Sequence, residues 1–135
     1  MKTIATLIVT MLIGVQFLAA QGQTAQPADK KTLAWNETVH DFGKIILNEP
    51  ATVTFTVTNS GAAPALITTA KSSCGCTVAE YTKEPIKPGE SGLVKATYNS
   101  ARVGSFTKSV TVTFDGVATG DVLTIKGEVI AKSTE

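Results

Sequence analysis

The sequence is short of the residues on which most protein chemistry depends. Its 135 residues include two cysteines, one histidine and one tryptophan. The two cysteines and the histidine give three possible metal ligands, which is too few for the usual four-ligand zinc site. Basic and acidic residues nearly balance, 12 against 11, so no basic stripe exists for nucleic acid or an anionic membrane. The glycines are too dispersed for a phosphate-binding loop. The composition therefore favours a small binding or structural protein.

Long apolar runs are also missing, except at the N-terminus. Lys2 precedes an apolar stretch from Ile4 to Ala20, which is typical of a secretory signal peptide. The run is shorter than the roughly 20 apolar residues of a membrane-spanning helix, so cleavage is favoured over a retained anchor. We expect a signal peptide at residues 1–20 and a soluble mature protein beginning near Gln21. The expected location is the periplasm or the medium, with no membrane contact after cleavage.

The mature chain divides into a short linker, one domain and a tail. Residues 21–32 are polar and include Pro27, which predicts a disordered linker. Residues 33–131 suit one domain of about 100 residues, and residues 132–135 form a C-terminal tail. Loss of Lys2 leaves 11 basic and 11 acidic residues, so the mature protein is close to neutral.

The domain shows the period of β-strands and no helical periodicity. Between Thr52 and Thr58, threonine alternates with Val53, Phe55 and Val57, which predicts a half-buried strand. About seven such strands, separated by turns rich in Gly, Pro and Asn, indicate an all-β, Ig-like antiparallel β-sandwich. The shared phase predicts a core made of Val53, Phe55, Val57, Val94, Tyr98, Val110, Val112, Phe114, Ile125 and Val129.

The specific chemistry available lies in Cys74-Gly75-Cys76. Exported compartments are oxidising, so a disulfide is favoured over free thiols. In an extended strand, residues i and i+2 lie about 6.6 Å apart, near the upper limit for a disulfide. Bridging therefore requires a turn at Gly75, and we expect positive φ there. A ring this small should be strained and easily reduced.

Three roles for the cysteine pair remain open. The first is structural, as a local disulfide that pins a strand corner. The second is redox exchange, for which Lys71 is the nearby cation in the sequence, although a C-x-x-C motif on a helix is absent. The third is binding of copper or another soft metal by Cys74 and Cys76, with His40 as a weak third ligand.

Polar residues near these cysteines have simpler interpretations. Ser72, Ser73 and Thr77 are typical turn formers through side-chain to backbone hydrogen bonds. His40 stands beside Asp41 without any serine nucleophile motif, so a packed or capping histidine is favoured over a catalytic base. We therefore predict no catalytic residue and no cofactor.

Several motifs occur in a recognisable order: H-D-F-G at 40–43, T-N-S-G at 58–61, S-S-C-G-C-T at 72–77, K-P-G-E at 87–90, G-S-F-T-K at 104–108 and I-K-G-E-V at 125–129. In these motifs and their order, the sequence resembles the bacterial domain-of-unknown-function family 1573 across the whole mature domain. The resemblance implies an exported, Ig-like fold, distantly similar to major-sperm-protein, Hydin-type and pilus-chaperone sandwiches. It implies no established activity.

These observations together predict an exported cell-envelope module that is not an enzyme. We expect it to act by contact with another envelope protein through pairable strand edges. The alternative is a thiol-redox or copper-binding protein acting through Cys74 and Cys76.

Overall fold

The computed structural model describes residues 32–133. The expected signal peptide and the linker up to residue 31 lie outside this range. Eight strands make up the described region: β1 (Leu33–Trp35), β2 (Val39–Ile46), β3 (Ala51–Asn59), β4 (Ile67–Ser72), β5 (Thr77–Tyr81), β6 (Ser91–Tyr98), β7 (Gly104–Phe114) and β8 (Asp121–Ile130). Within these residues no helix is long and apolar enough to cross a membrane.

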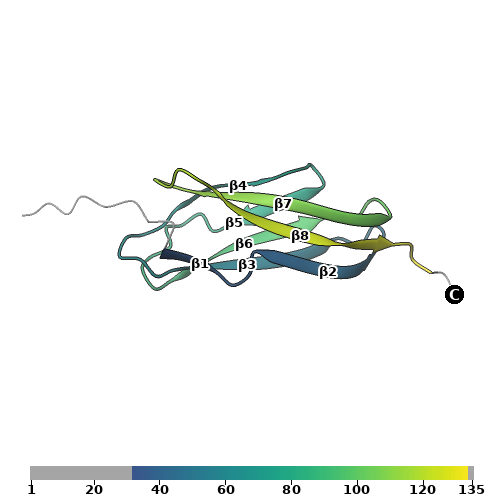
Figure 1. The fold of residues 1–135 in the computed structure, drawn as a ribbon, viewed down its shortest axis with the longest axis horizontal. Helices are drawn as coiled ribbons and strands as arrows, with labels where there is room; N and C mark the ends of the chain where they lie inside the picture. The colour runs from purple at the N-terminus through teal and green to yellow at the C-terminus, as the bar shows by residue number, and fades with distance from the viewer. Residues whose placement is uncertain (1–31, 134–135) are drawn as a thin grey trace, which may run out of the picture.

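The strands form two stacked four-stranded sheets, which confirms the predicted Ig-like β-sandwich (Figure 1). One sheet has the order β1-β3-β6-β5 and the other the order β2-β8-β7-β4. Two of the four outermost strands, β4 and β5, follow each other in the chain and lie at the same side of the sandwich, as do β1 and β2.

The core follows the predicted period of two. All ten predicted core residues are buried, and Phe55, Val57, Val94, Val110, Val112, Ile125 and Val129 are completely inaccessible to solvent. Burial removes roughly 25 cal/mol of unfavourable hydration free energy per Å² of apolar surface. Burial of these apolar side chains therefore determines which face of each strand points inward, and the alternate residues point outward.

The sequence predicts about seven strands, and β5 is the additional one. Its residue pattern is not that of a half-buried strand. Thr77 is buried while Val78 is 60% exposed, so the polar residue faces inward and the apolar residue faces solvent. A hydrophobic-in, polar-out rule cannot identify such a segment. It is held at the sheet edge by pairing with β6, from Thr77↔Tyr98 to Tyr81↔Val94.

One strand pair departs from the antiparallel expectation. β2 runs parallel to β8, while the other named pairs are antiparallel. The chain crosses from one sheet to the other between Trp35 and Val39 without reversing, so β2 continues the direction of β1 (Figure 1). Periodicity gives the face of a strand but not its partner or direction, so the sequence could not reveal this pair.

The end of the sandwich that carries the cysteines is held together by loop contacts. The N–H of Asn48, in the β2–β3 turn, donates to the Ser100 carbonyl at 3.0 Å. The hydroxyl of Ser100 donates to the Glu49 carbonyl at 2.6 Å. Ser100 is buried and has a left-handed φ of 47°. These bonds fix the β6–β7 loop, which lies beside the turn containing the cysteines.

Candidate functional site

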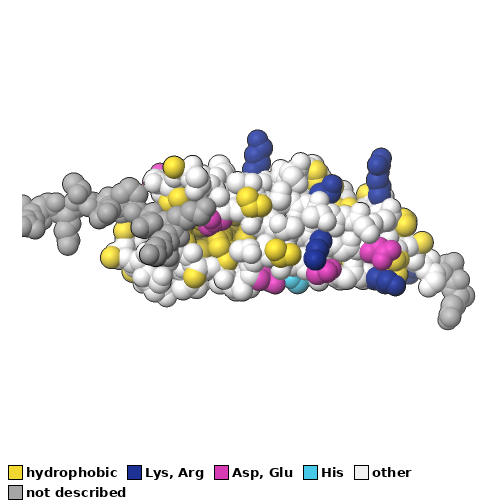
Figure 2. Space-filling view, viewed as in Figure 1, with side chains coloured by type: hydrophobic (Ala, Val, Ile, Leu, Met, Phe, Trp, Pro, Cys, Tyr) yellow, Lys and Arg dark blue, Asp and Glu magenta, His cyan; other side chains and the backbone are white. Residues whose placement is uncertain are grey.

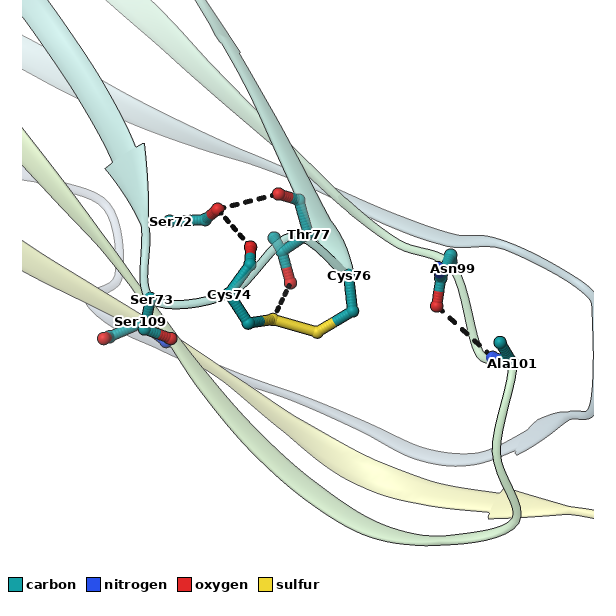
Figure 3. The surroundings of a disulfide bond; sticks show 8 residues. All are labelled: Ser72, Ser73, Cys74, Cys76, Thr77, Asn99, Ala101 and Ser109. Carbon is teal, nitrogen blue, oxygen red and sulfur yellow. Dashed lines mark hydrogen bonds between the residues drawn. A yellow bond between two sulfur atoms is a disulfide. The ribbon is translucent and has the colours of Figure 1, made fainter.

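Cys74 and Cys76 lie in the short turn between β4 and β5, and their sulfurs are bonded to each other (Figure 3). Their Cα atoms are 5.4 Å apart, within the usual range for a disulfide. The bond closes a ring within one chain, at the point where the backbone passes from one sheet to the other. Both cysteines are half-buried.

Hydroxyl groups hold the turn in shape, as the sequence predicted for Ser72 and Ser73. The single proton of the Ser72 hydroxyl is shared between the carbonyls of Cys74 at 2.6 Å and Thr77 at 2.8 Å. Ser73 Oγ accepts the N–H of Ser109 on β7 at 3.2 Å. The turn is therefore fastened to itself and to the neighbouring strand, so the two sulfurs have a fixed position.

Thr77 differs from the predicted turn former. It begins β5, is 4% exposed, and its Oγ1 lies 3.9 Å from Cys74 Sγ. A disulfide sulfur carries no hydrogen, so the threonine hydroxyl is the donor. Within residues 32–133 this hydroxyl has no other hydrogen bond, and its contact is to sulfur rather than to backbone.

Gly75 does not have the positive φ that the sequence predicted. Its φ lies outside the left-handed region, and a Cβ built on it meets no atom within 4 Å. The turn brings the two cysteines together without a left-handed residue because the Ser72 hydroxyl holds the carbonyls of Cys74 and Thr77. Glycine is therefore not required at this position for steric reasons.

A hollow of about 300 Å³ opens beside Cys76, and its remaining lining comes from β6, the β6–β7 loop and β7: Tyr98, Asn99, Ala101, Arg102 and Lys108. Two of these side chains are cationic, and none of the lining residues is acidic. Neither Arg102 nor Lys108 forms a salt bridge within residues 32–133. The disulfide thus borders a pocket of net positive charge.

Sequence reasoning missed both of these cations and named Lys71 instead. Lys71 lines a separate hollow between β4 and β7. The alternation of β7 could have indicated Lys108, because this residue stands at an inward position of the strand, between Phe106 and Val110. A charged residue at an inward position of a strand is unusual and points to a specific local environment. Arg102 stands in a loop and carries no comparable signal.

His40 is far from the cysteines in the fold. It lies on β2, at the opposite edge of its sheet from β4. Its Nδ1 is 3.1 Å from Glu37 Oε1, and its ring meets Phe42 edge-on at 4.7 Å. Within the described residues no group of three His, Cys, Asp or Glu could hold a metal ion. The structure does not bring His40 together with Cys74 and Cys76.

A second candidate site is the edge of β3 that β1 leaves uncovered. β1 pairs with β3 only from Val57 to Asn59. Next to them, Asn36 N donates to Thr56 O at 2.9 Å, and Thr56 N donates to Asn36 Oδ1 at 2.7 Å. Backbone groups alternate in direction along a strand, so Thr52 and Thr54 point theirs to the same side as Thr56.

Residues Ala51–Phe55, called here the open half of β3, therefore carry unpaired backbone groups. Within residues 32–133 the N–H and C=O of Thr52 and Thr54 have no hydrogen-bond partner. The neighbouring edge of β2 is less receptive, because its register shifts between Asp41 and Lys44 and it is lined with charge. Figure 2 shows positive and negative side chains interspersed over the viewed face rather than gathered in one patch.

Comparison with protein families assigns the fold to a known group. Residues 33–129 match the family described as "Protein of unknown function (DUF1573)". The chain belongs to this family. The match spans almost all of the described sandwich, including the cysteine turn, the open half of β3 and the hollow beside Cys76. No curated protein matches the DUF1573 chain.

Solved structures similar to the DUF1573 domain share its fold at low identity. The ASH/PapD-like domain 7 of human CEP192 has a TM-score of 0.66 at 9% identity, covering 98% of this chain and 99% of that one. A protein of unknown function from Porphyromonas gingivalis gives 0.62 at 19%, covering 72% and 46%. The VesB protease of Vibrio cholerae gives 0.59 at 18%, covering 73% and 32%.

The last two matches cover less than half of the longer proteins. The chain spans 46% of the Porphyromonas gingivalis protein and 32% of VesB. At these identities the comparisons establish a common β-sandwich and nothing about activity. Function must therefore be argued from the residues of the DUF1573 domain itself.

Proposed function

We propose that the DUF1573 domain is an exported, non-enzymatic module of the cell envelope that binds another envelope protein by strand addition. The proposal rests on the backbone N–H and C=O groups of Thr52 and Thr54, which have no partner within the described residues. Each offers one N–H and one C=O along an open sheet edge, which is the arrangement to which an extended peptide adds.

The open half of β3 has the size and character of a short docking strand. Five residues in extended conformation span roughly 17 Å. An incoming segment would lie in line with β1 and antiparallel to β3, and Thr52 and Thr54 would exchange up to four backbone hydrogen bonds with it. Thr52 and Thr54 are neutral, so docking needs no buried charge.

Side chains on the outer face of this sheet would supply selectivity. Thr52 Oγ1 is 2.9 Å from Thr97 Oγ1 on β6, so these threonines form a fixed row of hydroxyls. Leu93, opposite Thr56 on the far side of β3 from the open edge, is 50% exposed on the same face. A partner strand with alternating small polar and apolar residues matches this surface, because successive side chains of a strand alternate between faces.

The test removes one backbone donor from the open edge without changing the β3–β6 ladder. Thr54→Pro deletes the edge-facing N–H, and proline is tolerated where the N–H points away from the sheet. Thr54→Val is the matched control, because it keeps the N–H and the side-chain shape. Each tagged variant captures partners from envelope extract, and thermal melting checks that it is folded.

We expect the parent and Thr54→Val to capture the same envelope protein and Thr54→Pro to lose it. Hydrogen exchange should show new protection of the Thr52 and Thr54 amides in the captured complex. Equal capture by Thr54→Pro, with the fold intact, would exclude strand addition at this edge.

Export is part of the proposal and has its own measurement. The apolar run after Lys2 supports a cleaved signal peptide. Fractionation should find the protein in the periplasm or the medium, with an intact mass that begins near Gln21. Retention of Met1 in the mass would contradict this part.

Thiol chemistry remains the second candidate, and the cationic hollow beside Cys76 favours it. Copper binding would first require the disulfide to be reduced, because each sulfur is now bonded to the other. Exchange with thiols needs no additional ligand, and the surroundings of the two sulfurs support a specific version of it.

A further inference from the structure

The two sulfurs of the disulfide have different surroundings. Cys76 borders the hollow that contains Arg102 and Lys108. Cys74 does not line that hollow, and its Sγ instead lies near the buried hydroxyl of Thr77. Figure 3 shows Cys76 on the side of the bond that faces Asn99 and Ala101, and both of these residues line the hollow. The bond therefore has one end toward an open cationic space and one end toward a hydrogen-bond donor.

The cationic end is suited to attract an anion. Lys108 is half-buried on the inward phase of β7, and its side chain is part of the lining of the hollow. Neither Lys108 nor Arg102 has a carboxylate partner within residues 32–133, so both charges remain available. A positive, partly enclosed space concentrates anions and raises their rate of encounter.

The other end is suited to receive negative charge. The hydroxyl of Thr77 already points at Cys74 Sγ and has no competing acceptor within residues 32–133. If the disulfide opened with the electron pair on Cys74, this hydroxyl would donate a charge-assisted hydrogen bond to the thiolate. A stabilised leaving thiolate accelerates thiol–disulfide exchange.

We propose that the Cys74–Cys76 disulfide is an exchange site with a fixed polarity, in which an external thiolate attacks Cys76 and Cys74 leaves. The external sulfur forms a bond to Cys76 Sγ, the Cys76–Cys74 bond breaks, and its electron pair passes to Cys74 Sγ. The products are a mixed disulfide on Cys76 and a thiolate on Cys74. A second external thiolate then attacks the external sulfur of the mixed disulfide and releases Cys76 as a thiolate. Overall, two external thiols become one disulfide and the protein gains two electrons.

This role is independent of the open half of β3. The two sites are separated by β6, since the open edge of β3 faces the β1 side and the cysteine turn leads into β5 on the other side of β6. Loss of partner capture in Thr54→Pro would leave the exchange reaction unchanged, so either proposal can fail alone.

The first experiment locates the mixed disulfide. The oxidised protein without its signal peptide is mixed with reduced glutathione, quenched with acid after short intervals, and digested with a protease. Fragment masses then assign glutathione to Cys74 or Cys76. We expect it on Cys76 in the earliest samples. Early adducts on Cys74, or no adduct and no opening of the bond, would overturn the proposal.

The second experiment tests the charges with three thiols: anionic glutathione, neutral 2-mercaptoethanol and cationic cysteamine. Rates are expressed per thiolate, to remove differences in thiol pKa. We expect the preference for glutathione over cysteamine to fall about tenfold in Arg102→Met/Lys108→Met. Lys71→Met is the matched control, because Lys71 lines a different hollow, and it should keep the preference. An unchanged preference in the double variant would overturn the role of the hollow.

Thr77→Val tests the leaving group with a side chain of the same shape. All three thiols should react about threefold to tenfold more slowly, with their order unchanged. Melting of the variant shows whether β5 remains folded, and Thr77→Ser, which restores a hydroxyl, should recover the rate. Equal rates in Thr77→Val and the parent would remove Thr77 from the mechanism.

A further arm identifies the source of the thiolate. The same assay uses a folded protein that carries one exposed cysteine, with the rate again expressed per thiolate. Faster reaction of glutathione assigns the hollow to small thiols, and faster reaction of the protein thiol assigns it to exported protein cysteines. Reaction with neither would overturn the exchange site.

Discussion

The two long sides of the sandwich are closed in different ways. On the β4–β5 side, a four-residue turn with a disulfide joins the two sheets, and Tyr81 OH donates to the Thr68 carbonyl at 2.9 Å. On the β1–β2 side, the chain crosses between the sheets once, and Trp35 Nε1 donates to Asp121 Oδ2 at 2.9 Å. The first side has a disulfide-bridged turn and a side-chain hydrogen bond between its strands, whereas the second leaves part of β3 without a neighbour.

The difference shows how a small domain can keep one edge receptive. A bare strand edge invites aggregation unless it is short or blunted. Here β1 covers one end of β3, and the remaining open half is only five residues long. On the β4–β5 side the disulfide and the hydroxyl contacts hold the turn in one shape, and on the β1–β2 side the backbone groups of β3 stay available for another chain.

The largest expected effect comes from the core that both sides share. Phe55 on β3 is completely buried, so Phe55→Ala should lower the free energy of unfolding by about 3–5 kcal/mol. Thr54→Ala, one residue away on the exposed face, should change it by less than about 0.5 kcal/mol. Urea unfolding of both variants measures the difference. Equal stability of Phe55→Ala and the parent would mean that β3 faces the other way.

Removal of the disulfide should cost less than loss of core packing. The bond closes a loop of only three residues, for which the chain-entropy relation gives about 1–2 kcal/mol. Cys74→Ser/Cys76→Ser should therefore remain folded and unfold at a lower urea concentration. The parent protein treated with a strong reductant serves as a control and should match it. Failure of the double variant to fold would show that the β4–β5 side depends on the bond far more than loop entropy requires.

The hydrogen bond that bridges β4 and β5 should contribute a smaller amount. Tyr81→Phe removes the donor to the Thr68 carbonyl but keeps the ring, which Lys83 Nζ approaches at 3.5 Å from its centroid. We expect a loss of about 0.5–1.5 kcal/mol. Urea unfolding of this variant beside Val78→Ala, on the exposed face of the same strand, separates the hydrogen bond from general effects on β5. Identical stability of all three proteins would show that the bond does not close this side.

The smallest effect is expected at Gly75. Gly75→Val should change stability by no more than about 0.5 kcal/mol, because φ lies outside the left-handed region and an added Cβ meets open space. Gly43→Val is the informative comparison: its site is equally open, but its φ is 64°, so it should cost at least about 1 kcal/mol. Thermal melting ranks the two variants, and equal losses would argue against this conformation of the cysteine turn.

Local patterns predicted the sandwich because each of its central strands buries one face. The alternation around Phe55 and Val112 identified the core without any knowledge of strand partners. The same reasoning failed for β5, where Thr77 is buried beside a disulfide sulfur and Val78 faces solvent. The parallel run of β2 beside β8 was equally hidden, since it depends on the path of the chain between the sheets.

The candidate sites were harder to foresee than the fold. The sequence named Cys74 and Cys76, but it pointed to Lys71 as the nearby cation, whereas the fold brings Lys108 to the hollow from more than thirty residues away. It also grouped His40 with the cysteines as a weak alternative, and the sheet order separates them. These relations are tertiary, so only the charge of Lys108 on an inward strand position was visible beforehand.

The parallel pairing of β2 with β8 has a mechanical consequence. The described chain enters at one end of the sandwich through β1 and leaves after Ile130 at the other end (Figure 1). Tension between these points draws the start of β2 and the end of β8 in opposite directions. The hydrogen bonds of this pair, on both sides of the register shift between Asp41 and Lys44, then bear the load in shear. A pull along the long axis therefore loads this strand pair in shear instead of opening it one hydrogen bond at a time.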